Sequence, residues 1–113
     1  MRPVRHKFNA VRTERDGIRF DSKLEARYYD WLKVQEASGA LLFFLRQSPF
    51  HLKGGTRLVI DFMEFWSDGS VLFTDVKGIE TDAFKIKRRE VEARFGIEIN
   101  VVKKIPTLEV SRK

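Results

Sequence analysis

Hydrophobic and polar residues recur along this chain with two periods, and the longer period predicts two helices. A serine and a glutamate three positions apart, Ser22 and Glu25, form a capping box at the start of the first helix. Ser38-Gly39 is typical of its end. A second helix is predicted from about Thr81 to Phe95, closed by Gly96. The apolar stripe of the first helix consists of Leu24, Tyr28, Trp31 and Leu32.

The segments between the two helices are short, mainly apolar and bounded by turn residues, as is typical of strands. Leu41 to Arg46 and Phe50 to Leu52 each predict a strand, separated by a bend over residues 47–49 that contains a proline. Arg57 to Trp66 and Ser70 to Lys77 predict an antiparallel hairpin, because an Asp-Gly pair lies between them.

The two ends of the chain carry less pattern. Ile97 to Val102 predicts a last strand, after which residues 103–113 form a basic tail. Residues 1–20 form a basic N-terminal extension. Asp16-Gly17 within it indicates either a hairpin or a loose arm.

The order of these elements predicts one α/β domain over residues 1–113. It reads helix, three strands, helix and strand, which corresponds to a sheet of about four strands flanked by two helices. Nearly continuous apolar strands favour a sheet covered on both faces.

Composition narrows the classes of function. The chain has 113 residues, a net charge of +6 and a pI near 9.8, which favours a polyanion as the partner. No cysteine is present, which excludes disulfides and thiolate metal sites. His6 and His51 are far apart, and the longest uncharged apolar run, residues 40–45, is too short to cross a membrane. A protein of a reducing cytoplasm is expected.

Several charged residues stand where the strand pattern predicts burial. Asp61 interrupts an apolar run, and Asp75 and Lys77 share one strand face because they are two positions apart. A turn at the Asp-Gly pair brings Asp61 opposite Val76, to within one register step. Glu25, in the first turn of the first helix, is a candidate fourth member of this cluster.

Clustered carboxylates require a counter-charge. Two like charges about 4 Å apart repel by about 4 kcal/mol at an effective dielectric near 20. A divalent cation relieves that repulsion, and an all-oxygen ligand set favours Mg²⁺ or Mn²⁺. The combination predicts metal-assisted hydrolysis of a phosphodiester, with Lys77 orienting the attacking water or neutralising charge that develops on the phosphate.

These residues carry a resemblance to a known superfamily. Ile60-Asp61, followed by Asp75-Val76-Lys77 after a helix bearing Glu25, resembles the PD-(D/E)XK nuclease signature on a restriction-endonuclease-like core. A wider set of motifs is similar to small phage-encoded proteins related to Holliday-junction-resolving endonucleases, and this resemblance spans residues 20–102. The motifs are Phe20 to Ala26, Gln47 to Phe50, Asp61-Phe62, Asp75 to Gly78, and Thr81 to Lys87.

The resemblance implies a mixed sheet and specific roles for the clustered residues. Glu25, Asp61 and Asp75 would be ligands of Mg²⁺, with Mn²⁺ able to substitute, and Lys77 the catalytic lysine. Gln47 is an accessory candidate. Two departures from the pattern are Ile60 in place of the motif's proline and Asp75 where many members have glutamate.

Structural roles compete with these assignments. Glu25 is also the residue that a capping box directs to the Ser22 amide. Asp75 and Lys77 also fit an exposed same-face pair, and Gln47 a turn residue that bonds the backbone. Asp21 and Glu64 are both expected at the surface. Glu64 is expected on the opposite strand face from Asp61.

The leading hypothesis is a Mg²⁺-dependent, structure-specific DNA endonuclease, most closely a Holliday-junction resolvase, in the bacterial host cytoplasm if phage-encoded. The alternatives are a nickase or exonuclease on other DNA forms, or a non-catalytic nucleic-acid-binding protein. Symmetric resolution requires two cuts and therefore a homodimer. Candidate partner-facing residues are Phe43, Phe44, Phe65 and Trp66. Candidate DNA contacts are Arg2, Arg5, Lys7, Arg12, Arg15, Lys85, Lys87 and Arg88.

Overall fold

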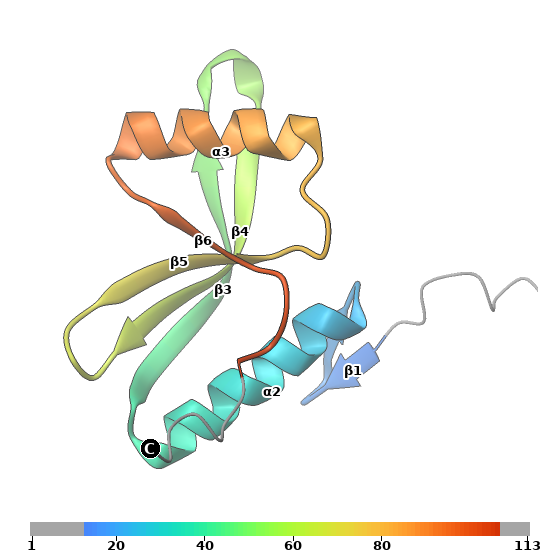
Figure 1. The fold of residues 1–113 in the computed structure, drawn as a ribbon, viewed down its shortest axis with the longest axis vertical. Helices are drawn as coiled ribbons and strands as arrows, with labels where there is room; N and C mark the ends of the chain where they lie inside the picture. The colour runs from blue at the N-terminus through green and yellow to red at the C-terminus, as the bar shows by residue number, and fades with distance from the viewer. Residues whose placement is uncertain (1–12, 107–113) are drawn as a thin grey trace, which may run out of the picture.

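A four-stranded mixed sheet separates two helices, with α2 on one side and α3 on the other (Figure 1). The structure is a computed structural model and describes residues 13–106. Strand order is β3-β4-β5-β6, with antiparallel pairing except between β5 and β6, which are parallel. The elements are β1 (Thr13–Arg15), β2 (Ile18–Phe20), α2 (Lys23–Ser38), β3 (Leu41–His51), the 3-10 turn η1 (Lys53–Gly55), β4 (Arg57–Trp66), β5 (Val71–Val76), α3 (Asp82–Phe95) and β6 (Ile99–Val102). The predicted class and element order are confirmed.

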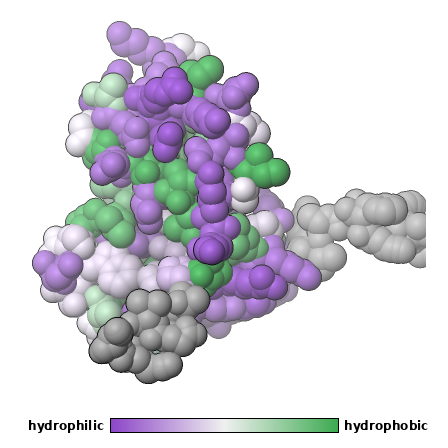
Figure 2. Space-filling view, viewed as in Figure 1, coloured by the Kyte–Doolittle hydropathy of each residue, from purple (hydrophilic) through white to green (hydrophobic). Residues whose placement is uncertain are grey.

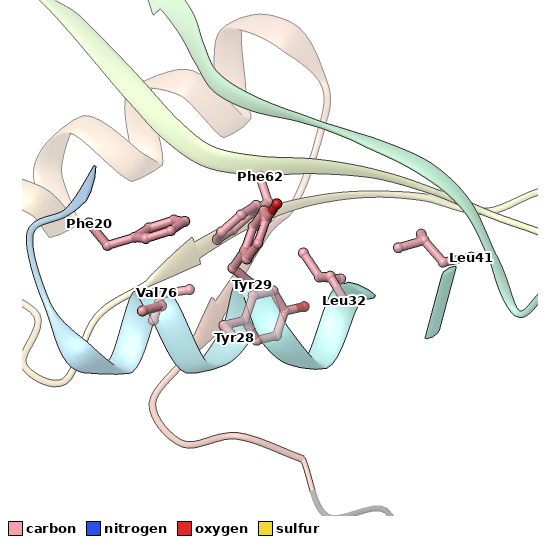
Figure 3. Close-up of a cluster of buried hydrophobic side chains, with 8 residues drawn as sticks. Phe20, Tyr28, Tyr29, Leu32, Leu41, Phe62 and Val76 are labelled. Atoms are coloured by element: carbon pink, nitrogen blue, oxygen red, sulfur yellow. The ribbon is translucent and has the colours of Figure 1, made fainter. Parts of the chain in front are cut away.

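Helix α2 begins and ends where its caps predict. The Ser22 hydroxyl accepts a hydrogen bond from the Glu25 amide at 3.0 Å, and Gly39 ends the helix in the left-handed region with φ 89°. The buried side chains of the helix pack against Phe62 of β4 and Val76 of β5, as Figure 3 shows. From α2 they include Ala26, Tyr28, Tyr29 and Leu32.

A second core lies under α3. Phe84 and Val91 of this helix are buried against Leu58 and Ile60 of β4. Alternate residues of one strand share a face, yet Phe62, two positions after Ile60, packs against α2. The β3–β4 hairpin must therefore twist strongly between Ile60 and Phe62. The twist lies at the boundary between the two cores, where the pairing of β4 with β5 ends.

Strand β3 corrects one prediction. It is a single strand from Leu41 to His51, instead of two strands separated by a bend. Pro49 is tolerated because β3 is an edge strand, which has a side without ladder hydrogen bonds. The irregularity is carried by Gln47, which adopts φ 53° while its neighbours keep their pairing with β4.

The structure decides between the two alternatives at the N-terminal end and shifts one boundary at the C-terminal end. Asp16 and Gly17 have φ 51° and 78° and join β1 to β2, so this segment is a hairpin and not a loose arm. The last strand begins at Ile99, two residues later than predicted. The basic extension before residue 13 and the tail after residue 106 lie outside the described residues.

Glu64 was expected at the surface, and this prediction is wrong. Its carboxylate is fully buried and accepts hydrogen bonds from the Tyr28 hydroxyl at 2.6 Å and the Trp66 indole N–H at 3.0 Å. Burial raises the pKa of this carboxyl group. Glu64 does lie on the opposite strand face from Asp61, but α2 covers that face.

The other face of this part of the sheet is open. Phe43 and Phe65 stack there with ring centroids 4.4 Å apart, whereas Phe44 and Trp66 pack against the core under α2. Leu45, beside Phe43, is 49% exposed. Figure 2 shows hydrophilic side chains over α3 and apolar or weakly polar ones over the strands below it. Among residues 13–106, no helix is long and apolar enough to cross a membrane.

We predict that Tyr28→Phe lowers the free energy of unfolding by about 1–3 kcal/mol, because it removes a hydrogen bond from the buried Glu64 carboxylate. Tyr29→Phe is the matched control, since its hydroxyl donates to Asp16 in an exposed turn and the loss there should be smaller. Urea unfolding measures both. Equal losses in the two variants would contradict the role given to the Glu64 contact.

Candidate active site

Two aspartates lie where strands β4 and β5 separate. Backbone pairing between the strands runs as far as Phe62 and Thr74. Beyond that point the Asp61 amide donates to Asp75 Oδ1 at 3.1 Å, and the Val76 amide donates to Asp61 Oδ2 at 2.9 Å. The carboxylates therefore replace the missing ladder hydrogen bonds. The observed register places Asp61 opposite Asp75, one step from the predicted position opposite Val76.

Asp75 is the most deeply buried member of the cluster. Its side chain is 1% exposed, and Oδ2 has no hydrogen-bond partner among the described residues. The nearest cation is the Lys77 ammonium, whose Nζ lies 3.5 Å from Asp75 Oδ2 and 4.9 Å from the centre of the Phe84 ring. The alternative of an exposed Asp75–Lys77 surface pair is therefore wrong for Asp75, which is an interior carboxylate.

Glu25 approaches the same region from α2. Its backbone amide bonds the Ser22 hydroxyl, which satisfies the cap. Within the described part of the chain, its carboxylate is paired with Arg46 Nη2 at 3.8 Å and not with the Ser22 amide. The capping role thus engages the Glu25 backbone and leaves its carboxylate available to the site.

A pocket of about 330 Å³ lies beside Asp61. Asp75 and Lys77 do not line it: Asp75 accepts a hydrogen bond from the Asp61 amide, and Lys77 is paired with Asp75. Gln47, which has a positive φ, lies on its wall. The residues that line the pocket are Arg19, Asp21, Glu25, Arg46, Gln47 and Asp61.

Sequence reasoning missed two residues that line the pocket, Arg19 and Arg46. The available signal for Arg46 was its position, since it is the charged residue that ends an apolar run in β3. Sequence reasoning also assigned Asp21 only to the surface; it is exposed, as expected, and lines the pocket as well.

The electrostatics of the site favour protonation of two carboxyl groups near neutral pH. Burial, assisted by the Asp61 charge and opposed by Arg46, raises the pKa of Glu25 to about 7. Burial and the Asp61 charge also raise the pKa of Asp75 to about 7, while Lys77 opposes the shift. The side-chain cations of the site therefore leave part of its negative charge unrelieved.

The donor set fits a hard divalent cation, although it is not assembled around one. Glu25, Asp61 and Asp75 offer only oxygen donors, and the buried Asp75 Oδ2 accepts no hydrogen bond. Among residues 13–106, however, no three acidic side chains are grouped closely enough to hold a metal ion as they stand. Glu25 Oε2 is paired with Arg46, and a cation that engages this carboxylate would compete with that pair.

The basic residues proposed for DNA contacts divide into two groups. Arg2, Arg5, Lys7 and Arg12 lie outside the described residues. Within them, Arg15 Nε lies 3.0 Å from both Asp30 oxygens, and Arg88 pairs with Glu80 at 3.9 Å. Lys87 Nζ donates to the Arg57 carbonyl at 3.4 Å, and Lys85 is exposed. Arg15, Lys87 and Arg88 therefore have intramolecular partners.

For the metal-free protein we predict that stability falls as pH rises from 5 to 8. The raised pKa of Glu25 means that the folded protein retains a proton that the unfolded chain releases near pH 4.5, so its stabilisation is lost as pH approaches about 7. Glu25→Gln should flatten this dependence by up to about 3 kcal/mol, measured by urea unfolding in chelator.

Glu80→Gln is the control for this measurement. A hydrogen bond from Lys103 lowers the pKa of Glu80, so this residue contributes pH dependence only at lower pH. An unchanged slope between pH 5 and 8 in Glu25→Gln would contradict a Glu25 pKa raised by burial.

Comparison with known proteins places the chain in a family without assigning an activity. No curated protein and no solved structure matches it. The nuclease resemblance therefore stays a prediction. The model of one family, DUF1064, matches residues 5–110 and is described as a protein of unknown function. Because this match spans almost the entire sequence, the chain belongs to the DUF1064 family.

Proposed function

We propose that this protein is a Mg²⁺-dependent, structure-specific DNA endonuclease that hydrolyses backbone phosphodiesters, with four-way junctions as the preferred substrate. The observation that carries the proposal is the hydrogen-bonded Asp61–Asp75 pair at the strand split, in which Asp75 is buried and its Oδ2 lies 3.5 Å from the Lys77 ammonium. Carboxylates concentrated beside one amine, next to an open pocket, fit the chemistry of phosphodiester hydrolysis.

Each member of the cluster has a distinct task. Glu25, Asp61 and Asp75 would hold the Mg²⁺ ion, which when bound activates water and polarises a phosphate oxygen. Asp61 and Asp75 are fixed by hydrogen bonds with backbone amides, so their free oxygens keep a defined direction. Lys77 is held beside Asp75 and over the Phe84 ring, where its charge neutralises negative charge that develops on the phosphate.

A non-catalytic nucleic-acid-binding protein is the second candidate. It is favoured by the hydrogen bonds of Asp61 and Asp75, since these satisfy backbone amides and give both residues a structural role. That role uses one oxygen of each carboxylate. It does not require a second Asp75 oxygen that is buried without a hydrogen bond, nor a lysine beside it, so the hydrolase explains more of the site.

The form of the substrate follows from size and charge. A net charge of +6 on 113 residues supports binding to a phosphate backbone. The small domain has little room for a separate base-reading module. Contacts with phosphates fix position and orientation without reading sequence, so recognition of branched DNA shape is favoured over sequence.

The open sheet face offers a place for a second copy of this chain. The part of this face that α3 leaves uncovered carries five apolar residues from three adjacent strands: Phe43, Leu45, Met63, Phe65 and Val71. A two-fold dimer would also supply the two active sites that symmetric cutting needs.

We expect the wild-type protein to cut a labelled four-way junction in Mg²⁺, to spare a matched linear duplex, and to be inactive in chelator. Asp61→Asn and Lys77→Ala should each lower the cleavage rate by at least about 100-fold. The amide side chain introduced by Asp61→Asn retains an oxygen for the Val76 amide, so this variant should fold and still bind DNA. Gel electrophoresis of the products measures cleavage.

Asp68→Asn is the matched control for these variants. Asp68 lies at the opposite end of the β4–β5 hairpin, and an asparagine there can still accept the Ser70 hydrogen bonds. Its activity should equal that of the wild type. Junction binding without fragments under all metal conditions would favour the non-catalytic protein instead.

Leu45→Lys should convert the dimer to a monomer, because it places a charge in the open apolar face. Val34→Lys, at a similarly exposed apolar position on α2, should leave the dimer intact. Sedimentation equilibrium measures both. A wild-type protein that remains monomeric at 100-fold above its cleavage-assay concentration would refute this interface.

A further inference from the structure

Arg46 is the one residue of the described pocket that brings a largely buried positive charge to its carboxylates. Its side chain is 24% exposed, and its guanidinium lies over the Phe20 ring, 4.8 Å from the ring centre. Phe20 belongs to β2, so the small β1–β2 hairpin supports the guanidinium from below. Stacking on an aromatic ring holds the plane of a guanidinium in one orientation.

Much of the hydrogen-bonding capacity of this guanidinium is unused. A guanidinium has five N–H donors. Arg46 Nη2 lies 3.8 Å from Glu25 Oε2, which is an ion pair longer than a hydrogen bond. Arg46 Nε is buried and has no hydrogen-bond partner among the described residues. A buried donor left unpaired costs about 1–3 kcal/mol, so this arrangement favours a ligand that takes those donors.

The chemistry of the pocket selects the class of ligand. The fork of a guanidinium matches the oxygens of a phosphate group, and the pocket supplies a second arginine, Arg19, and the Gln47 amide. Its other wall holds Asp21, Glu25 and Asp61, whose charges repel a free anion. Phosphate binding therefore becomes favourable when a cation offsets these carboxylates.

We infer that Arg46 binds a backbone phosphate of the nucleic acid, and that Glu25 restrains Arg46 until a divalent cation engages the Glu25 carboxylate. This inference rests on the proposed metal dependence of the same site. It adds Arg46 to the proposed site and links two steps. Cation binding releases the Arg46 guanidinium, and the released guanidinium raises the affinity for DNA. Metal and DNA should then bind with positive cooperativity.

The test measures DNA affinity in a Lys77→Ala background, in which cleavage does not interfere. Fluorescence anisotropy with a labelled four-way junction gives the affinity at several salt concentrations, in Mg²⁺ and in chelator. Mg²⁺ should tighten binding of the background protein at least tenfold more than that of the same protein with Arg46→Gln. In Mg²⁺, Arg46→Gln should also reduce the slope of log affinity against log salt by about one.

Two further variants make the result specific to Arg46. Arg27→Gln removes an equal charge from a different groove on α2, and it should leave both the slope and the Mg²⁺ enhancement unchanged. Arg46→Lys keeps a positive charge beside Glu25, so the protein stays folded even if Arg46→Gln does not. Lysine lacks the paired donors, and affinity in Mg²⁺ should fall about tenfold.

The outcomes separate this inference from the proposed function. If the wild-type protein cleaves DNA and Arg46→Gln leaves both the salt-dependence slope and the Mg²⁺ enhancement unchanged, only the inference about Arg46 would be overturned. If Arg46→Gln reduces the salt-dependence slope but the wild-type protein never cleaves DNA, the phosphate contact would be supported and the proposed nuclease activity overturned. Equal effects of Arg27→Gln and Arg46→Gln would reduce the contribution of Arg46 to general charge and overturn the inference.

Discussion

The reciprocal hydrogen bonds between Asp61 and Asp75 and the backbone are the constraint on which this architecture depends. They close the gap where β4 leaves β5 and so allow the β3–β4 hairpin to twist from one helix to the other. Burying the Asp75 carboxylate opposite that of Asp61 is costly, and Lys77 offsets only part of this cost. The same contacts that make the fold possible therefore concentrate negative charge beside an open pocket.

Local sequence features predicted most of the fold. Ser22 and Thr81 begin the two helices, and Gly39 and Gly96 end them, because caps depend on residues within one turn of the helix end. The cluster of Asp61, Asp75 and Lys77 was also predictable. Two-residue alternation fixes the face of a side chain, and a two-residue turn fixes the register of a hairpin.

Features that arise from the packing of distant elements were not predictable in this way. Glu64 follows a strand pattern that fits a solvated face, and only the position of α2 shows that this face is covered. Arg46 reads as the polar end of an apolar run, and its role depends on Glu25 and Phe20, which belong to elements far along the chain. The continuity of β3 depends on Gln47 adopting a backbone conformation unusual for a side chain of its size.

The small β1–β2 hairpin is tied to α2 and, among the described residues, has no pairing with the main sheet. Asp16 accepts a hydrogen bond from the Tyr29 hydroxyl, and Arg15 forms an ion pair with Asp30, so the hairpin is attached to the helix by two polar contacts. One wall of the pocket therefore belongs to α2 and the segment before it, and the other belongs to β3 and β4. The packing of α2 against the sheet sets the width of the pocket, so substitutions in that core would reshape the pocket without changing any residue that lines it.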